Sequence, residues 1–175
     1  MQSRAKETMI AAVDVYYDEY TATAAAVVFE SWGDSWPIDH VLNECDNFDT
    51  YQPGYFYKRE LPCLLNVLNI IPHPLSTIVI DGYVWLKEPS HLGLGAHLYY
   101  TLDQSIAVIG VAKTFLQQAK DVVPITRGKS QRPLYISAAG TATTHAADCI
   151  QSMHGAFRIP TLLKMADQLS RKAIS

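Results

Sequence analysis

The sequence predicts an α/β fold in which a mixed β-sheet is flanked by helices, in one domain over residues 1–175. Segments 9–17 and 21–32 are rich in Ala, Val and aromatic residues, and the short polar stretch between them favours a β-hairpin. Segments 76–81 and 105–111 are apolar runs with many β-branched residues, which are typical of strands buried on both faces. A chain of 175 residues with 49% hydrophobic residues can bury one core of this kind.

The region after the hairpin predicts a short strand and then a helix. Residues 35–41 favour a third strand, although Pro37 and the polar stretch 43–50 argue against a long one. In residues 54–71 the apolar side chains recur at steps of three and four, which is the spacing of a helix. We expect Pro62 in the first turn of this helix or at a bend in it, because proline lacks the N–H that a helix interior uses.

The second half of the chain alternates helix and strand. A helical segment at 91–102 separates the runs 76–81 and 105–111, and a helical crossover of this kind makes the two strands parallel neighbours. The remaining pattern predicts one more strand and then two helices, at 134–137, 143–154 and 161–174.

Composition restricts the class of protein. No apolar run approaches the roughly 18 to 20 residues that a membrane helix needs, so we expect a cytoplasmic protein without a membrane partner. Cys45, Cys63 and Cys149 are odd in number and form no CxxC pair, so we expect reduced thiols rather than disulfides or a zinc site.

The net charge of −3 does not by itself indicate a nucleic-acid-binding protein, because such proteins usually gather Lys and Arg on one face. A cluster of metal-binding carboxylates would lower the total, however, and basic residues still gather locally at Arg127, Lys129 and Arg132. The distribution of charge therefore matters more than its sum.

Two aspartates interrupt strands that are otherwise apolar. Asp14 lies within Ala-Ala-Val-Asp-Val, and Asp81 ends Ile-Val-Ile-Asp-Gly. Burying a carboxylate costs several kcal/mol unless it is compensated, either by a metal ion or by an Arg, Lys or backbone partner. One such aspartate favours the second explanation, but two in one small domain favour a metal.

A third acid, Glu60, lies near the start of the helix predicted at 54–71, where it can simply interact with the helix dipole. If the first strand is central and the strand 76–81 lies beside it, this helix can bring Glu60 to Asp14 and Asp81. Such oxygen ligands suit Mg²⁺ or Mn²⁺, which can activate water for phosphodiester hydrolysis.

The joint order of several motifs resembles the endonuclease V family along nearly the whole chain. Its most specific part is Tyr-x-Pro-Gly followed at a fixed distance by Arg-Glu. The motifs are Asp14 in DVYY, Glu60 in YQPGYFYKRELP, Asp81 in VIDG, LGLGAHL from Leu92, IGVAK ending at Lys113, and RIP at Arg158.

The resemblance implies a ribonuclease H-like fold and a Mg²⁺-dependent cut in nucleic acid near inosine or deoxyinosine, with Mn²⁺ as a substitute. It makes Asp14, Glu60 and Asp81 the catalytic metal carboxylates, and it puts Lys113 near the scissile phosphate. Tyr51 would be the wedge tyrosine that inserts at the lesion. Outside the motif context, the more common roles are a turn aromatic packed on Pro53 for Tyr51 and a surface lysine at a helix start for Lys113.

Basic residues predict the rest of the nucleic-acid surface. Arg59 lies inside the strongest motif, whereas Arg127 and Lys129 lie in a polar connection where they can contact phosphates or simply be solvated. We expect the protein to act on inosine-containing DNA or RNA as a monomer.

The sequence also departs from the family pattern. The family reads Gly-His-Gly and then His-Pro after the strand-end aspartate, whereas this chain has Tyr83 and, further on, Lys87. Thr141 stands where the family has a catalytic histidine, for which the nearby His145 is a candidate substitute or a surface residue. Tyr83 and Trp85 can form a different pocket floor or pack in the core. The other histidines are predicted to be structural: His40, His73, His91, His97 and His154.

Two other functions remain open. A relative of the family can have lost catalysis or been redirected as a nucleic-acid-binding protein, or the acids can serve a small-molecule phosphohydrolase. A basic and aromatic track favours a nuclease, whereas a closed pocket favours the phosphohydrolase.

Overall fold

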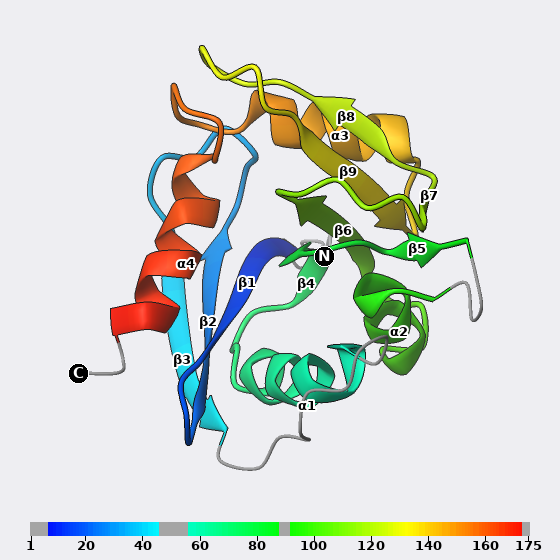
Figure 1. Cartoon of the computed structure of the whole chain (residues 1–175). Helices are drawn as coiled ribbons and strands as arrows, with labels where there is room; N and C mark the ends of the chain where they lie inside the picture. The colour runs from blue at the N-terminus through cyan, green and yellow to red at the C-terminus, as the bar shows by residue number, and fades with distance from the viewer. Residues whose placement is uncertain (1–6, 46–55, 88–91, 173–175) are drawn as a thin grey trace, which may run out of the picture.

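The computed structural model describes residues 7–45, 56–87 and 92–172, and its centre is a seven-stranded mixed sheet (Figure 1). The strand order is β3-β2-β1-β4-β6-β9-β8. These strands are β1 (Met9–Tyr17), β2 (Ala22–Phe29), β3 (Asp39–Cys45), β4 (Leu75–Asp81), β6 (Ala107–Ala112), β8 (Val123–Ile125) and β9 (Leu134–Ala139). A separate two-stranded sheet contains β5 (Trp85–Leu86) and β7 (Ala119–Lys120). The helices are α1 (Phe56–Asn69), α2 (Leu94–Thr101), α3 (Thr143–Ser152) and α4 (Thr161–Lys172).

The pairing of the strands follows the predicted order. β1 and β2 form the antiparallel hairpin, which is confirmed, and β3 extends it at the edge of the sheet. β4 pairs in parallel with both β1 and β6, so the predicted crossover is confirmed as well. β1 and β4 are therefore adjacent near the middle of the sheet, with an antiparallel group of strands on either side.

Helices cover both faces of the sheet and build two apolar cores. Side chains alternate along β1, so that Ala11 and Val13 face α1 and α2, whereas Ile10 and Ala12 face α3 and α4. This alternation explains why β1 is apolar without interruption up to Asp14. No helix in the described ranges has the length and apolar character needed to cross a membrane.

Several local predictions are corrected. The strand expected at 35–41 forms later, at Asp39–Cys45, because an edge strand tolerates polar residues such as Asn43 on its exposed side. Pro62 lies inside α1 rather than in its first turn. The short strands β5, β7 and β8 were not predicted, because runs of two or three residues carry no readable periodicity.

Candidate active site

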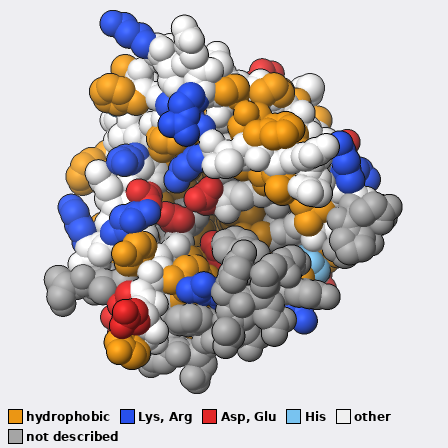
Figure 2. Space-filling model, viewed as in Figure 1, with side chains coloured by type: hydrophobic (Ala, Val, Ile, Leu, Met, Phe, Trp, Pro, Cys, Tyr) orange, Lys and Arg blue, Asp and Glu red, His pale blue; other side chains and the backbone are white. Residues whose placement is uncertain are grey.

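A small cavity of about 30 Å³ lies where β1 and β4 run side by side under α4. The parallel pairing ends at Val13 and Ile80, so the next residue of each strand is an acid, Asp14 or Asp81. Both acids line the cavity, and strand alternation puts them on the face that α4 covers. Figure 2 shows acidic side chains gathered near the centre of the view, with Lys and Arg side chains beside them.

The carboxyl group of Asp14 is largely buried among other acids. Its pKa is raised to about 7, first by burial, then by the charge of Asp81 and a hydrogen bond with Asp167, while the charge of Lys113 opposes the shift. Asp14 therefore keeps its proton close to neutral pH unless a cation takes the place of that proton.

Glu60 lies on the opposite side of the sheet and interacts electrostatically with the two strand-end acids. It is buried in α1, and its pKa is raised to about 8 by burial first and then by the charges of Asp14 and Asp81. Its buried Oε2 atom has no hydrogen-bond partner among the described residues. Because α1 packs on the face opposite to α4, Glu60 and the two aspartates come from different sides of the sheet.

A fourth acid, Asp167, belongs to the site, although it was not predicted as a site residue from the sequence. It lies in α4 and lines the same cavity as Asp14 and Asp81. Burial raises its pKa, but hydrogen bonds with Arg171 and Asp14 outweigh burial and hold the pKa below its usual value. One sequence feature could have indicated Asp167 as a site residue. It directly follows Ala166, at the edge of the apolar stripe of an amphipathic helix.

The chemistry of these acids fits a divalent cation. Hard carboxylate oxygens are the ligands that Mg²⁺ and Mn²⁺ prefer, burial and neighbouring acids raise the pKa values of Asp14 and Glu60, and Oε2 of Glu60 has no hydrogen-bond partner among the described residues. Within the part of the chain that the structure describes, no group of three His, Cys, Asp or Glu residues is already arranged to hold a metal ion. That Asp14, Glu60 and Asp81 share one ion therefore stays a prediction, and it requires side-chain rearrangement.

Lys113 is held next to these acids. Its Nζ lies 3.5 Å from Oδ2 of Asp81, and it lines the same cavity. Arg158 donates from Nη2 to the carbonyl oxygen of Lys113 at 2.5 Å, and the hydroxyl of Tyr83 donates to the carbonyl oxygen of Thr114 at 2.6 Å. The backbone around Lys113 is thus fixed from two directions.

A larger cavity of about 270 Å³ begins at Gly82, the residue after β4. Its lining is mostly apolar and includes Tyr57, Tyr83 and Leu116. The ring of Tyr57 is stacked on His97, with 3.7 Å between the ring centroids. This cavity therefore has aromatic walls, and its lining begins one residue after Asp81 in the chain.

The two aromatic residues at the departure from the family pattern have different roles. Tyr83 lines the larger cavity, as expected for a pocket residue. Trp85 instead packs against a small buried cluster and donates from Nε1 to the carbonyl oxygen of Ala138 at 2.8 Å. Lys87 is exposed after β5, and Thr141 lies just before α3.

The expectation that Arg127 contacts nucleic acid is wrong. Its side chain is buried, and its guanidinium donates to the carbonyl oxygens of Met153, Gly155, Phe157 and Arg158. These bonds hold the connection between α3 and α4, so the guanidinium is not available to phosphates.

The other predicted contact residues are spread over the molecule. Arg59 lies over the ring of Tyr17, with its Cζ 3.8 Å from the ring centroid. Lys129 is exposed between β8 and β9, in agreement with either a phosphate contact or a solvated loop. His145 is exposed on α3, 3.5 Å from the thiol of Cys149, and is not part of the acid cavity. Tyr51 lies outside the described residues.

The remaining histidines and cysteines agree with structural roles. His73 contacts Asp39 at 3.0 Å, and His154 contacts Thr161 at 2.9 Å. His91 lies outside the described residues. The three cysteines are buried thiols that form no disulfide among the described residues.

Known proteins resemble this chain in both sequence and structure. The family model for endonuclease V matches residues 1–130. Endonuclease V of Nostoc punctiforme is 28% identical over 182 residues, which cover 92% of this chain and 81% of that protein. Endonuclease V of Rippkaea orientalis is 26% identical over 186 residues, covering 92% of this chain and 78% of that protein.

Two solved structures share the architecture. Endonuclease V of Streptomyces avermitilis matches with a TM-score of 0.76 and 25% identity, covering 98% of this chain and 83% of the other. Endonuclease V of Ciona intestinalis, solved with a 24mer DNA containing an inosine, matches with a TM-score of 0.80 and 18% identity, covering 95% of this chain and 86% of the other. This chain therefore belongs to the endonuclease V family of nucleases and shares its ribonuclease H-like fold.

Proposed function

We propose that this protein hydrolyses a phosphodiester bond near inosine in DNA or RNA, in a reaction that depends on a divalent metal. The observation that carries the proposal is the gathering of Asp14, Asp81 and Asp167 with Lys113 around one cavity at the strand ends. Three acids gathered beside one lysine at an accessible cavity suit a charged reaction centre, because their mutual repulsion has a cost that an ordinary surface would avoid.

Asp14, Glu60 and Asp81 would hold the ion, and Asp167 would complete the acidic set. When bound, Mg²⁺ or Mn²⁺ supplies Lewis-acid activation of water and stabilisation of the leaving oxygen. Lys113 sits against Asp81 and offers its ammonium group to the phosphate that enters the site. The raised pKa of Asp14 means that its proton must leave before the carboxylate can act as a ligand.

The larger cavity supplies a place for a base taken out of its stack. An enzyme that acts beside a modified base usually extrudes that base into a pocket of stacking aromatic and apolar side chains. The cavity begins one residue after Asp81 and is lined by Tyr57, Tyr83 and Leu116, so a base there would put its own phosphate close to the acids. By resemblance, Tyr51 would act as the wedge at the vacated position.

The proposal is tested by cleavage of oligonucleotides that are identical except for one inosine. Single- and double-stranded DNA and RNA are compared in Mg²⁺, in Mn²⁺ and in EDTA. We expect metal-dependent cutting near inosine by the wild-type protein and no cutting by the Asp81→Asn variant. Asp148→Asn, which changes an exposed acid on α3, is the matched control and should cut normally. Equal cutting of unmodified strands would contradict the lesion preference, and cutting in EDTA would contradict the metal dependence.

A further inference from the structure

An exposed phenylalanine stands beside the proposed reaction centre. Phe115 is 67% exposed, two residues after Lys113, and two residues of chain span at most about 7 Å. Its ring contacts the ring of Tyr135 in an edge-to-face arrangement, with 5.9 Å between the centroids. One side of Phe115 is thus supported while the rest of the ring faces solvent.

The backbone that carries Phe115 is fixed from the catalytic side. Tyr83 donates its hydroxyl hydrogen to the carbonyl oxygen of Thr114, the residue between Lys113 and Phe115, at 2.6 Å. Arg158 holds the preceding carbonyl oxygen, that of Lys113. The ring is therefore held at a set distance from the acids rather than on a free loop.

Phe115 also borders a second hollow, of about 140 Å³, next to the larger cavity. Tyr83 and Leu116 line both spaces and so form the partition between them. The exposed Lys87 lines this second hollow and brings a positive charge to it. An aromatic face, an apolar wall and a lysine match what a nucleotide offers, namely a stacking base and a phosphate.

We propose that Phe115 and this hollow form a second base subsite, which stacks the nucleobase next to the one in the larger cavity. The inference rests on the proposed function, since the occupant is a neighbouring nucleotide of the same strand. A base is favoured over a protein partner because Lys87 lines the same hollow as Phe115, and because Phe115 follows Lys113, which contacts Asp81, by two residues. Stacking is tolerant of sequence, so this subsite adds affinity without selecting a particular neighbour.

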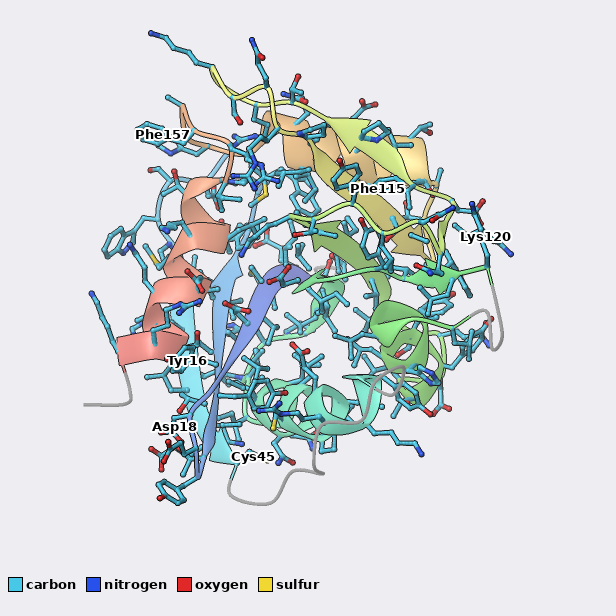
Figure 3. All side chains as sticks on the ribbon, viewed as in Figure 1. Tyr16, Asp18, Cys45, Phe115, Lys120 and Phe157 are labelled. Carbon is cyan, nitrogen blue, oxygen red and sulfur yellow. The ribbon has the colours of Figure 1, made fainter. Side chains whose placement is uncertain are left out.

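The chain offers a matched control. Phe157 is 79% exposed, and Figure 3 shows it near the start of α4, well away from Phe115. It lines neither of the two base cavities. Phe157→Ala therefore removes an equally exposed ring without touching the proposed subsite.

The test measures fluorescence anisotropy of labelled single-stranded oligonucleotides in EDTA, so that no bond is cut. Each contains one inosine, and in a series the flanking nucleotides are replaced one at a time by an abasic unit. We expect Phe115→Ala to weaken binding of the intact strand by about 5- to 150-fold, the range expected for one lost stacking contact. Phe115→Trp should bind about as well as the wild type, and so should Phe157→Ala.

The abasic series identifies the contact. At one flanking position the abasic unit should weaken wild-type binding and remove the difference between wild type and Phe115→Ala. The proposal is overturned if Phe115→Ala binds like the wild type, or if its loss is the same whichever flanking base is missing. If the Phe115 effect is present but inosine is not preferred over adenine, the subsite stands and the proposed lesion specificity fails. If the wild-type protein binds no oligonucleotide, both fail.

Discussion

Asp14 of β1 and Asp167 of α4 line the same cavity, and a side-chain hydrogen bond between their carboxyl groups couples their protonation. Burial and neighbouring acids raise the pKa of Asp14 to about 7, whereas the hydrogen bond with Arg171 helps to hold the pKa of Asp167 below its usual value. Arg171 stabilises the charged form of Asp167 through an ion pair at 2.9 Å. Under the proposed function, a divalent cation would displace the proton of Asp14.

The stability of the metal-free protein should fall as the pH rises from about 4 to about 8. The folded-state pKa values of Asp14 and Glu60, about 7 and about 8, lie above their ordinary values, so the folded state binds protons more tightly than the unfolded state. The stability due to this protonation is present in full below pH 4 and is lost as the pH rises to the folded-state values. Thermal unfolding in EDTA across this range measures the loss.

Mg²⁺ should reverse that loss, because it stabilises the deprotonated acids. We expect a larger rise of the melting temperature on adding Mg²⁺ at pH 8 than at pH 5. Asp14→Asn should flatten the pH dependence in EDTA and reduce the effect of Mg²⁺. A melting temperature that does not change with Mg²⁺ at pH 8 would show that the acids are not a cation site.

Asp167→Asn should lower the cleavage rate by at least about 10²-fold, the scale expected when a charged group at a reaction centre is removed. The reason is that Asp167 lines the acid cavity and receives the hydrogen bond of Asp14. Single-turnover cleavage of an inosine-containing strand gives the rate, and thermal unfolding checks the fold. Gln168→Ala, which alters the next and exposed residue of α4, should cut normally. A normal rate in Asp167→Asn would remove Asp167 from the mechanism.

Arg127→Ala should destabilise the fold, whereas Lys129→Ala should leave its stability unchanged. The buried guanidinium of Arg127 satisfies backbone carbonyls between α3 and α4, and its loss should cost at least about 2 kcal/mol of unfolding free energy. Lys129 is exposed, so its replacement should act only on binding, where it would flatten the salt dependence by about one unit if it contacts a phosphate. Urea unfolding and salt titrations of binding separate the two effects. Wild-type stability in Arg127→Ala would contradict the structural role.

Gly110→Ala should impair both stability and cleavage. A Cβ atom on Gly110 in β6 would overlap the carbonyl oxygen of Gly82 and lie 2.9 Å from Oγ of Ser137. Relief of this overlap must displace the strand end that carries Asp81, at a cost of about 1–3 kcal/mol. Gly33→Ala is the matched control, because a Cβ atom there meets no other atom within 4 Å. Equal melting temperatures and equal cleavage rates of the two variants would show that β4 and β6 adapt freely.

The longer strands of the sheet other than β3, and two of the acids, could be predicted from the sequence because their signals are local. An apolar run interrupted by Asp14, or ended by Asp81, can be read from a few adjacent residues, and the helix between two such runs predicts their parallel pairing. The joint order of the motifs also indicated the endonuclease V family, and the match of the family model to residues 1–130 confirms this assignment.

Tertiary packing alone decided the rest of the site. Asp167 joins Asp14 because α4, far along the chain, covers the strand ends, and no periodicity states which helix covers which strand. Arg127 is similar in sequence context to Lys129, yet it is buried because the segment before α4 folds over it and offers carbonyl oxygens. Local patterns determine which residues form strands and helices, whereas burial and charge depend on residues that are distant in sequence and adjacent only in the fold.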